Sequence, residues 1–244
     1  MTRRTAADVS FFLIDGQNVL GTLTDFEDKI EARTEEAHAL GDAWAAHKFV
    51  NVREGELTQN GFYDDEANSV HDALSSGPGS TRILSYCLEG TATGAGFVAW
   101  AGAVQVNYQR LAERDALTKA KATYKTAGVV EQGKVLLTWS APGSTGRKGI
   151  TDNAVSSTNG GFGYLHYNAS AGEANIRILH NDDGGTTWVV LGTFTKTASG
   201  HGAERITITG SINRYACADI TTATATGTIA ALNAFVGLVR NPAT

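Results

Sequence analysis

The apolar and polar residues of positions 22–60 follow a pattern that fits two structures. A helical period would place one apolar set on a common face: Leu23, Phe26, Ile30, Ala37 and Leu40. A strand period would gather charged residues on one face: Asp25, Glu27, Lys29, Glu31, Arg33 and Glu35. The opposite face would then carry Phe26, Ile30 and Ala32, with Asp28 as an exception. The turn signal at residues 40–42 favours the strand interpretation, a long β-hairpin with an extended loop.

Most of the remaining chain shows the short β-branched and aromatic runs that are typical of strands. Residues 11–14 predict a buried strand, and Asp15 and Gly16 predict the turn to a return strand at residues 17–21. Further strands are predicted at residues 50–59, 81–88, 94–111, 117–130, 134–139, 163–168, 175–180, 187–194, 203–208, 214–220 and 234–239. Residues 182–185 (DDGG) predict a hairpin turn in preference to a calcium site.

One clear helix is predicted at residues 64–76. Either Asp64 or Asp65 can cap its first turn, where a carboxylate also suits the helix dipole. Its apolar face would consist of Ala67, Val70, Ala73 and Leu74. Gly77 and Pro78 would then end the helix.

Composition divides the chain near its middle. Residues 141–149 (APGSTGRKG) are small, polar and rich in glycine, as expected of a linker. They would separate a domain at residues 1–140 from a second domain at residues 150–244, where short Thr-rich strands recur at near-regular spacing. The expected fold class is therefore mainly β: a β-sandwich with one flanking helix, followed by a second, jelly-roll-like sandwich.

Charge and cysteine content exclude some functions. The net charge of -5 and the pI near 5.7 argue against a general nucleic-acid binder, which needs a basic surface. No apolar run approaches the length of a membrane span, so membrane insertion is not expected. Cys87 and Cys217 stand in apolar, strand-like contexts and are expected to be buried, reduced thiols.

Candidate chemistry is sparse. Residues 143–149 superficially resemble a phosphate-binding loop, but the glycine spacing is wrong and no helix follows. The six histidines are scattered, and none stands at metal-ligand spacing from a cysteine or carboxylate. Some aromatic residues of the second half fit either sugar stacking or, preferably, a sandwich core: Tyr164, Tyr167, Trp188 and Tyr215. We therefore expect no catalytic residue, cofactor or metal, and a structural or binding protein in place of an enzyme.

Residues 10–138 resemble a known family in their overall layout. The blocks LIDGQNVLGTLTDFEDKIEARTEEAHALGDAW, GELTQNGFYDDEANSVHDAL, ILSYCLEG and FVAWAGAVQVNYQRLAERDALTKAKATYKTAGVVEQGKVL are similar to the tail tube proteins of long-tailed bacteriophages. Residues 161–220 look like the jelly-roll modules appended to virion proteins. The resemblance implies hexameric rings, whose inner sheets join into one barrel and which stack into a tube in the virion. It also implies assembly in the host cytoplasm, with a tape measure and a tail terminator protein as partners.

The resemblance gives the acidic hairpin a role. A tube that passes double-stranded DNA without binding it needs a wall that is not basic, and acidic side chains would repel DNA within about 8 Å of the wall. We hypothesise that one strand face supplies lumen charge, with Asp25, Glu27, Glu31 and Glu35 as candidates. The alternative is an ordinary solvated outer face.

Contact between rings is predicted for the loop of the same hairpin. Residues 34–52 could reach the next ring through His38, Trp44, His47 and Phe49. The second domain would project outward and make weak contact with cell-surface glycans. A carbohydrate- or receptor-binding virion protein and a capsid decoration protein, each acting through the second domain, are the alternatives.

Overall fold

The computed structural model describes residues 9–242 except 38–45, 67–68, 76–77, 91, 171–173, 196–198 and 223–231. Side chains of residues 33–37, 46–52 and 222 lie outside the described part. The elements are β1 (Phe11–Ile14), β2 (Gln17–Asn18), η2 (Leu20–Thr22), β3 (Leu23–Ala37), β4 (Ala46–Phe62), α1 (Val70–Ser75), β5 (Thr81–Cys87), β6 (Gly96–Leu111), β7 (Lys119–Ser140), β8 (Gly146–Asp152), β9 (Gly161–Ala169), β10 (Ala174–Asn181), β11 (Val189–Thr193), β12 (Gly200–Ile208), β13 (Tyr215–Thr222) and β14 (Leu232–Arg240).

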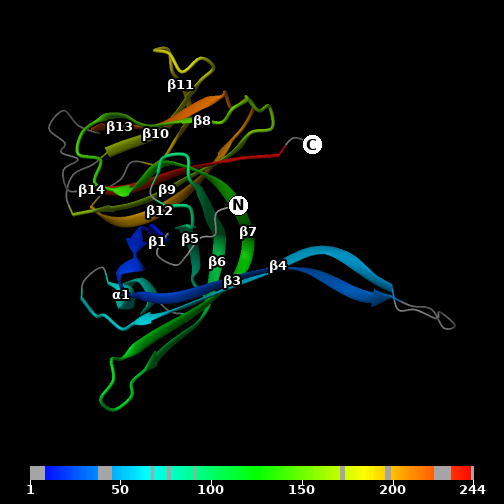
Figure 1. Ribbon diagram of the computed structural model, residues 1–244, viewed down its shortest axis with the longest axis vertical. Coiled ribbons are helices and arrows are strands. Elements are labelled where there is room, and N and C mark those ends of the chain that lie inside the picture. The colour runs from blue at the N-terminus through cyan, green and yellow to red at the C-terminus, as the bar shows by residue number, and fades with distance from the viewer. Residues whose placement is uncertain are drawn as a thin grey trace.

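Two antiparallel sheets organise these strands, which confirms the mainly β, sandwich-type fold class (Figure 1). The larger sheet has the order β12-β9-β14-β7-β6-β5-β1-β2, and the hairpin β3–β4 joins it through the first half of β7. The smaller sheet has the order β11-β10-β13-β8. Apolar residues between the two sheets form one core cluster, which includes Leu136, Ile176, Ile178, Ile220 and Val236.

Strand β1 is buried on both faces, which explains its unbroken apolar run FFLI. Phe12 and Ile14 pack into a cluster that also receives Val70 and Leu74 of α1. Phe11 and Leu13 point the other way, into a third cluster that contains Phe235 of β14. The β1–β2 turn has Asp15 at φ 46° and Gly16 at φ 87°, as a two-residue hairpin requires.

The strand interpretation of residues 22–60 is confirmed. β3 and β4 form a long antiparallel hairpin, in which Asp25, Glu27 and Lys29 lie opposite Asn60, Thr58 and Glu56 respectively. Asp28, the exception to the alternation, faces the body of the protein, where the buried Tyr86 hydroxyl donates a hydrogen bond to its carboxylate. Burial, together with this carboxylate, raises the pKa of Tyr86. A long-range partner therefore explains the polar residue on the inner face.

Three predicted elements differ from the structure. The predicted helix at residues 64–76 is only Val70–Ser75 long, because the Asp64 carboxylate and carbonyl organise a turn before it, accepting from the Glu66 amide and the Ser69 hydroxyl. The predicted return strand at residues 17–21 is two residues long and passes into a 3-10 turn. The two predicted strands at 117–130 and 134–139 are one strand, β7.

The strands of both halves share the larger sheet. β7 pairs with β14 and β14 pairs with β9, so the sheet continues across the predicted boundary at residues 141–149. Strand β8 begins at Gly146, inside the predicted linker, and pairs with β13. Buried His166 of β9 ties the halves further: its Nδ1 accepts the Gly16 amide at 3.1 Å, and its Nε2 lies 2.9 Å from the Ser85 hydroxyl. The division into domains stays a prediction.

Candidate functional site, a charged sheet face with open edges

Four strand segments form a sub-sheet in the order β3, β4, first half of β7, second half of β6. One face of it is covered: Leu57, Ala122 and Tyr124 are fully buried beside the helix-containing cluster. Side chains opposite each other in an antiparallel pair share a face, so the strand register defines the members of the uncovered face. We call this solvent-facing side the charged face.

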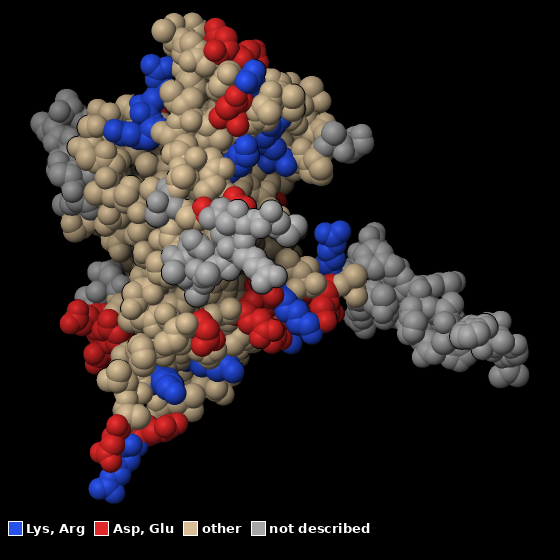
Figure 2. All heavy atoms as spheres, in the orientation of Figure 1, with Lys and Arg blue, Asp and Glu red and all other residues tan. Residues whose placement is uncertain are grey.

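The charged face carries acids on one pair of strands and lysines on its neighbour. Its carboxylates come from β3 and β4: Asp25, Glu27, Glu31, Glu54 and Glu56. Its lysines come mainly from β7: Lys29, Lys119, Lys121 and Lys125. Figure 2 shows acidic and basic side chains next to one another where the hairpin leaves the body. The face is thus mixed in charge with a small acidic excess, whereas the sequence suggested an acidic one.

Cross-strand contacts hold the charged face together. Lys125 Nζ lies 3.7 Å from Glu56 Oε2, and Lys29 Nζ lies 2.8 Å from Glu31 Oε1. The hydrogen bond to Glu31 raises the pKa of Lys29. Asn60 Nδ2 also donates to Asp25 Oδ1 at 2.6 Å. Solvent screens these exposed pairs, so they fix the arrangement of charges more than they stabilise the fold.

Two edges of the sub-sheet are open within the described residues. Among the described strands, β4 alone pairs with β3. At the other side β5 begins at Thr81, opposite Val104, so within the described part of the chain β6 pairs with β7 alone over residues 107–111. Both hairpins project from the body in Figure 1, β3–β4 to the right and β6–β7 downward. Unpaired strand edges are templates for another strand.

Apolar side chains accompany both open edges. Ile30 of β3 is 46% exposed, and Val106 and Leu111 of β6 are 43% and 50% exposed. A strand that paired with either edge would remove this apolar surface from water. Their positions fit edges that another strand covers.

The structure brings part of the predicted site together. Asp25, Glu27 and Glu31 are exposed on the charged face, whereas the Glu35 side chain lies outside the described residues. Among the predicted contacts between rings, His38 and Trp44 lie outside the described residues. His47 and Phe49 belong to β4, but their side chains are not described. Lysines alternate along the strand predicted at residues 117–130, yet only the register shows that they lie beside the acids.

Other predicted residues have structural surroundings. Cys87 and Cys217 are buried free thiols, as expected, and burial raises the pKa of Cys217 to about 12. Tyr164 belongs to the core, while the half-buried Trp188 donates to the Gly185 carbonyl at 2.8 Å. The DDGG segment is a turn in which the Gly184 amide donates to Asn181.

The described part of the chain contains no cluster of three or more histidine, cysteine, aspartate or glutamate residues that could hold a metal. Within that same part, no helix has the length and apolar character needed to cross a membrane.

Comparison with known proteins gives only weak similarities. No family model and no curated protein matches the chain. A chain from the tail of an empty GTA particle with C6 symmetry has a TM-score of 0.36 at 11% identity, covering 45% of this chain and 80% of that one. A chain of the anti-feeding prophage cap, a tube-terminating cap, has a TM-score of 0.41 at 11% identity, and the match covers 55% of this chain and 93% of that one. The SPP1 Dit hub protein has a TM-score of 0.36 at 8% identity, and the match covers 93% of this chain and 97% of that one. TM-scores this low leave the family of this chain open.

Proposed function

We propose that this chain is a structural subunit of a bacteriophage tail, and that it polymerises as stacked hexameric rings into the tail tube through which the genome is delivered. The observation that carries this proposal is the four-stranded sub-sheet with an open edge on each side. The sequence resemblance of residues 10–138 supplies the family and the six-fold ring. No catalytic step is assigned to the chain.

Head-to-tail pairing of the two edges would close the ring. The β3 edge of one subunit meets the β6 edge of the next, so each subunit uses two different surfaces. Such heterologous contacts generate a closed ring when the rotation between copies is a simple fraction of a turn. Closure would remove both open edges of the sub-sheet and cover Ile30, Val106 and Leu111.

The charged face would line the lumen. Asp25, Glu27, Glu31 and Glu35 are the proposed lumen carboxylates, and Lys29 and Lys125 stand beside carboxylates that neutralise them. Passing DNA therefore meets few unscreened cations, although the phosphates of duplex DNA follow one another about every 1.7 Å of its axis. The loop region with His38, Trp44, His47 and Phe49 is proposed to contact the next ring. The tape measure and terminator proteins would be further partners.

Disulfide trapping tests the pairing of the edges. Cysteine at Glu27 and at Gln109 in the same chain places one thiol beside each open edge, while the native thiols are buried. Neighbouring strands hold paired Cβ atoms about 5 Å apart, a distance that a disulfide can bridge. We expect oxidation to give a ladder of multimers from the double variant only. The register is scanned by moving the β3 cysteine to Asp25 or Lys29.

The single variants are matched controls. Each places a cysteine on only one edge, so neither forms a ladder. Monomers from every double variant would contradict edge pairing. Dimers from a single variant would show a symmetric, like-to-like contact in place of the proposed one. Negative-stain images of the purified chain should show six-fold rings or tubes.

A further inference from the structure

A groove separate from the charged face lies at the waist between the two halves of the chain. Its volume is ≈ 990 Å³, at the upper end of the range for small-molecule pockets. One wall comes from β6 and β7 near Gly96 and Lys134, and the other from residues 153–159 and the end of β14. Buried Phe97 and Leu238 belong to its lining. We call it the waist groove.

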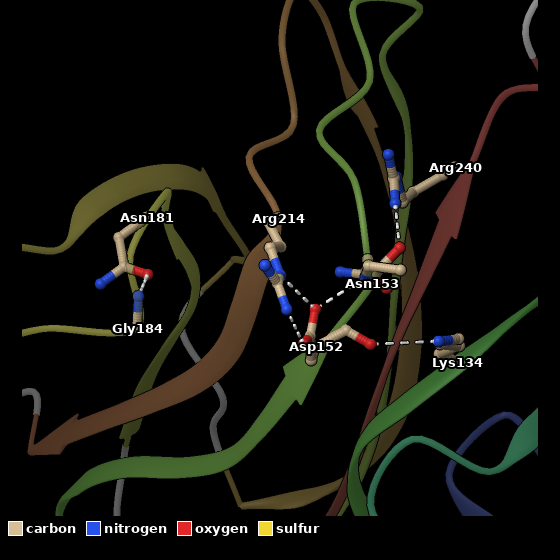
Figure 3. A network of polar contacts seen from close by, with 8 residues as sticks. Lys134, Asp152, Asn153, Asn181, Gly184, Arg214 and Arg240 are labelled. Atoms are coloured by element: carbon tan, nitrogen blue, oxygen red, sulfur yellow. Dashed lines mark hydrogen bonds and ion pairs between the residues drawn. The ribbon is translucent and has the colours of Figure 1, made fainter.

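Two cations converge on one stretch of main chain in this groove (Figure 3). Arg240 Nη1 donates to the Asn153 carbonyl at 3.4 Å, and Lys134 Nζ donates to the Asp152 carbonyl at 3.3 Å. The Asp152 carboxylate is occupied by Arg214, whose Nε and Nη2 lie 2.8 Å and 2.6 Å from it. These bonds lower the pKa of Asp152 to about 2. The Asp152 carboxylate is therefore hydrogen-bonded to Arg214, and not to Lys134 or Arg240.

Two buried donors in the groove have no partner. Arg240 Nε and Asn153 Nδ2 make no hydrogen bond within the described residues. Burial lowers the pKa of Arg240, as expected for a cation without a nearby carboxylate. Among the described residues that line the groove, Glu89 is the one with a carboxylate, and it accepts the Gly96 amide at 2.5 Å. Both atoms are closed off from solvent, so the donors available to a ligand in the groove are the outer guanidinium nitrogens of Arg240 and the exposed Lys134 ammonium.

The rim is polar and held in shape. Residues 156–159 (SSTN) and Asn241 present hydroxyl and amide groups to the groove. Asn159 Nδ2 donates to the Pro242 carbonyl at 2.6 Å, and Asn241 Nδ2 donates to the Asn159 carbonyl at 2.8 Å. Half-exposed Leu88 and exposed Val155 add apolar surface. A fixed rim of this kind lowers the entropy lost on binding.

We infer that the waist groove binds a carboxylated saccharide. Arg240 and Lys134 receive the carboxylate, and the polar rim pairs with sugar hydroxyls. An acidic peptide fits less well, because β6, β7 and β14 already have strand partners beside the groove and leave no edge for backbone pairing. Two cations beside Glu89 also suit a single carboxylate better than a polyphosphate chain.

Titration calorimetry of the purified full chain tests the inference with three probes: trigalacturonate, neutral galactotriose and oligoglutamate. We expect saturable binding of trigalacturonate only, weakening as salt rises. Lys134→Gln removes an exposed cation without touching the core and should weaken binding about tenfold, the loss expected for one charge-assisted hydrogen bond. Arg240→Gln should weaken it at least as much.

Matched controls keep the result interpretable. Lys148→Gln removes a lysine that bonds to Ser144, outside the groove, and should leave affinity unchanged. Circular dichroism shows whether each variant is folded. Equal binding of the neutral sugar, no saturable binding of trigalacturonate, or equal loss in Lys148→Gln would overturn the inference. Binding of oligoglutamate alone would reassign the groove to an acidic peptide. None of these results depends on whether the chain forms tubes.

Discussion

The two halves of strand β7 meet opposite environments although they belong to one strand. In the first half Ala120, Ala122 and Tyr124 are buried, while the alternate residues, three lysines and Thr123, lie on the other, solvated face. In the second half three consecutive residues, Val135, Leu136 and Leu137, are buried because core clusters cover both faces. Alternation of buried and exposed residues is typical of a sheet with one solvated face. An unbroken apolar run is typical of a sheet that is covered on both faces.

Under the proposed function, this difference separates a part of the fold that is complete in one subunit from a part that a neighbouring subunit completes. The covered half has an apolar cluster on each face. The uncovered half ends in open edges and presents a charged face. We therefore expect changes in the covered half to affect folding, and changes in the uncovered half to affect assembly.

Deleting residues 141–244 should have the largest effect. From the sequence, the second half is a decoration, and such a chain would still form tubes. In the structure the deletion removes β14 and β9, which exposes Phe11, Phe97 and Val135 of a cluster shared by both halves. We expect an aggregated or unfolded product in circular dichroism and gel filtration. A folded, monodisperse product would show that the first half is an independent domain.

Substitutions on the same strand compare its halves directly. Leu136→Ala should lower the free energy of unfolding by about 2–5 kcal/mol, because it leaves a cavity in the core between the sheets. Lys121→Ala on the charged face should change it by less than about 0.5 kcal/mol. Urea denaturation measures both. Similar losses in the free energy of unfolding from the two variants would contradict the proposed difference between the two halves of β7.

Lower pH should weaken the covered region through His166. Burial lowers its folded pKa to about 3 from 6.5, so the unfolded chain takes up the proton first as pH falls. Its contribution to stability is complete above pH 6.5 and is lost as pH falls toward 3, by up to about 1.4 kcal/mol per pH unit. Burial also lowers the pKa of His180, which acts in the same direction. Denaturation curves between pH 7 and about 5 measure the slope.

The variant His166→Gln isolates this effect, because its stability should fall less steeply with pH than that of the unaltered chain. His201→Gln, at an exposed position, is the matched control and should keep the original slope. Identical slopes for all three chains would mean that His166 does not govern the acid response.

Tyr86→Phe should lower the free energy of unfolding less than Leu136→Ala does. It removes the hydroxyl that reaches Asp28 at the base of the hairpin while keeping the buried ring. We expect a loss of about 1 kcal/mol, typical of one hydrogen bond, with hydrogen exchange rising mainly in β3. A uniform rise in hydrogen exchange across the protein would instead show that this bond stabilises the whole fold and not the hairpin alone.

The local sequence pattern predicted most of the strands, but it predicted little about which distant strands pack against one another. The pattern of residues 22–60 fitted a helix as well as a strand, and the surrounding strands, the turn signal at residues 40–42 and the family resemblance decided for the hairpin. Once the strand is chosen, its period of two places Asp25, Glu27 and Lys29 on one face. The sequence predicted two strands, at residues 117–130 and 134–139, but β7 continues through Gly133, where a Cβ would lie 2.4 Å from the Leu238 carbonyl oxygen of β14. That requirement comes from a distant strand, which local pattern does not contain.

The sites depend on such distant neighbours even more. The acids of β3 and the lysines of β7 form one face only through pairing with β4. Lys134 and Arg240 come from opposite halves of the sequence and share the waist groove because β14 pairs with β7. No motif links these residues, so sequence reasoning missed the groove entirely.

A cryo-electron-microscopy reconstruction of the assembled protein tests the central claim most directly. The account predicts a six-fold ring in which β3 of one subunit is hydrogen-bonded to β6 of the next, with Asp25, Glu27 and Glu31 facing the lumen. A particle with these carboxylates on its outer surface or between rings, or with both edges left unpaired, would contradict it.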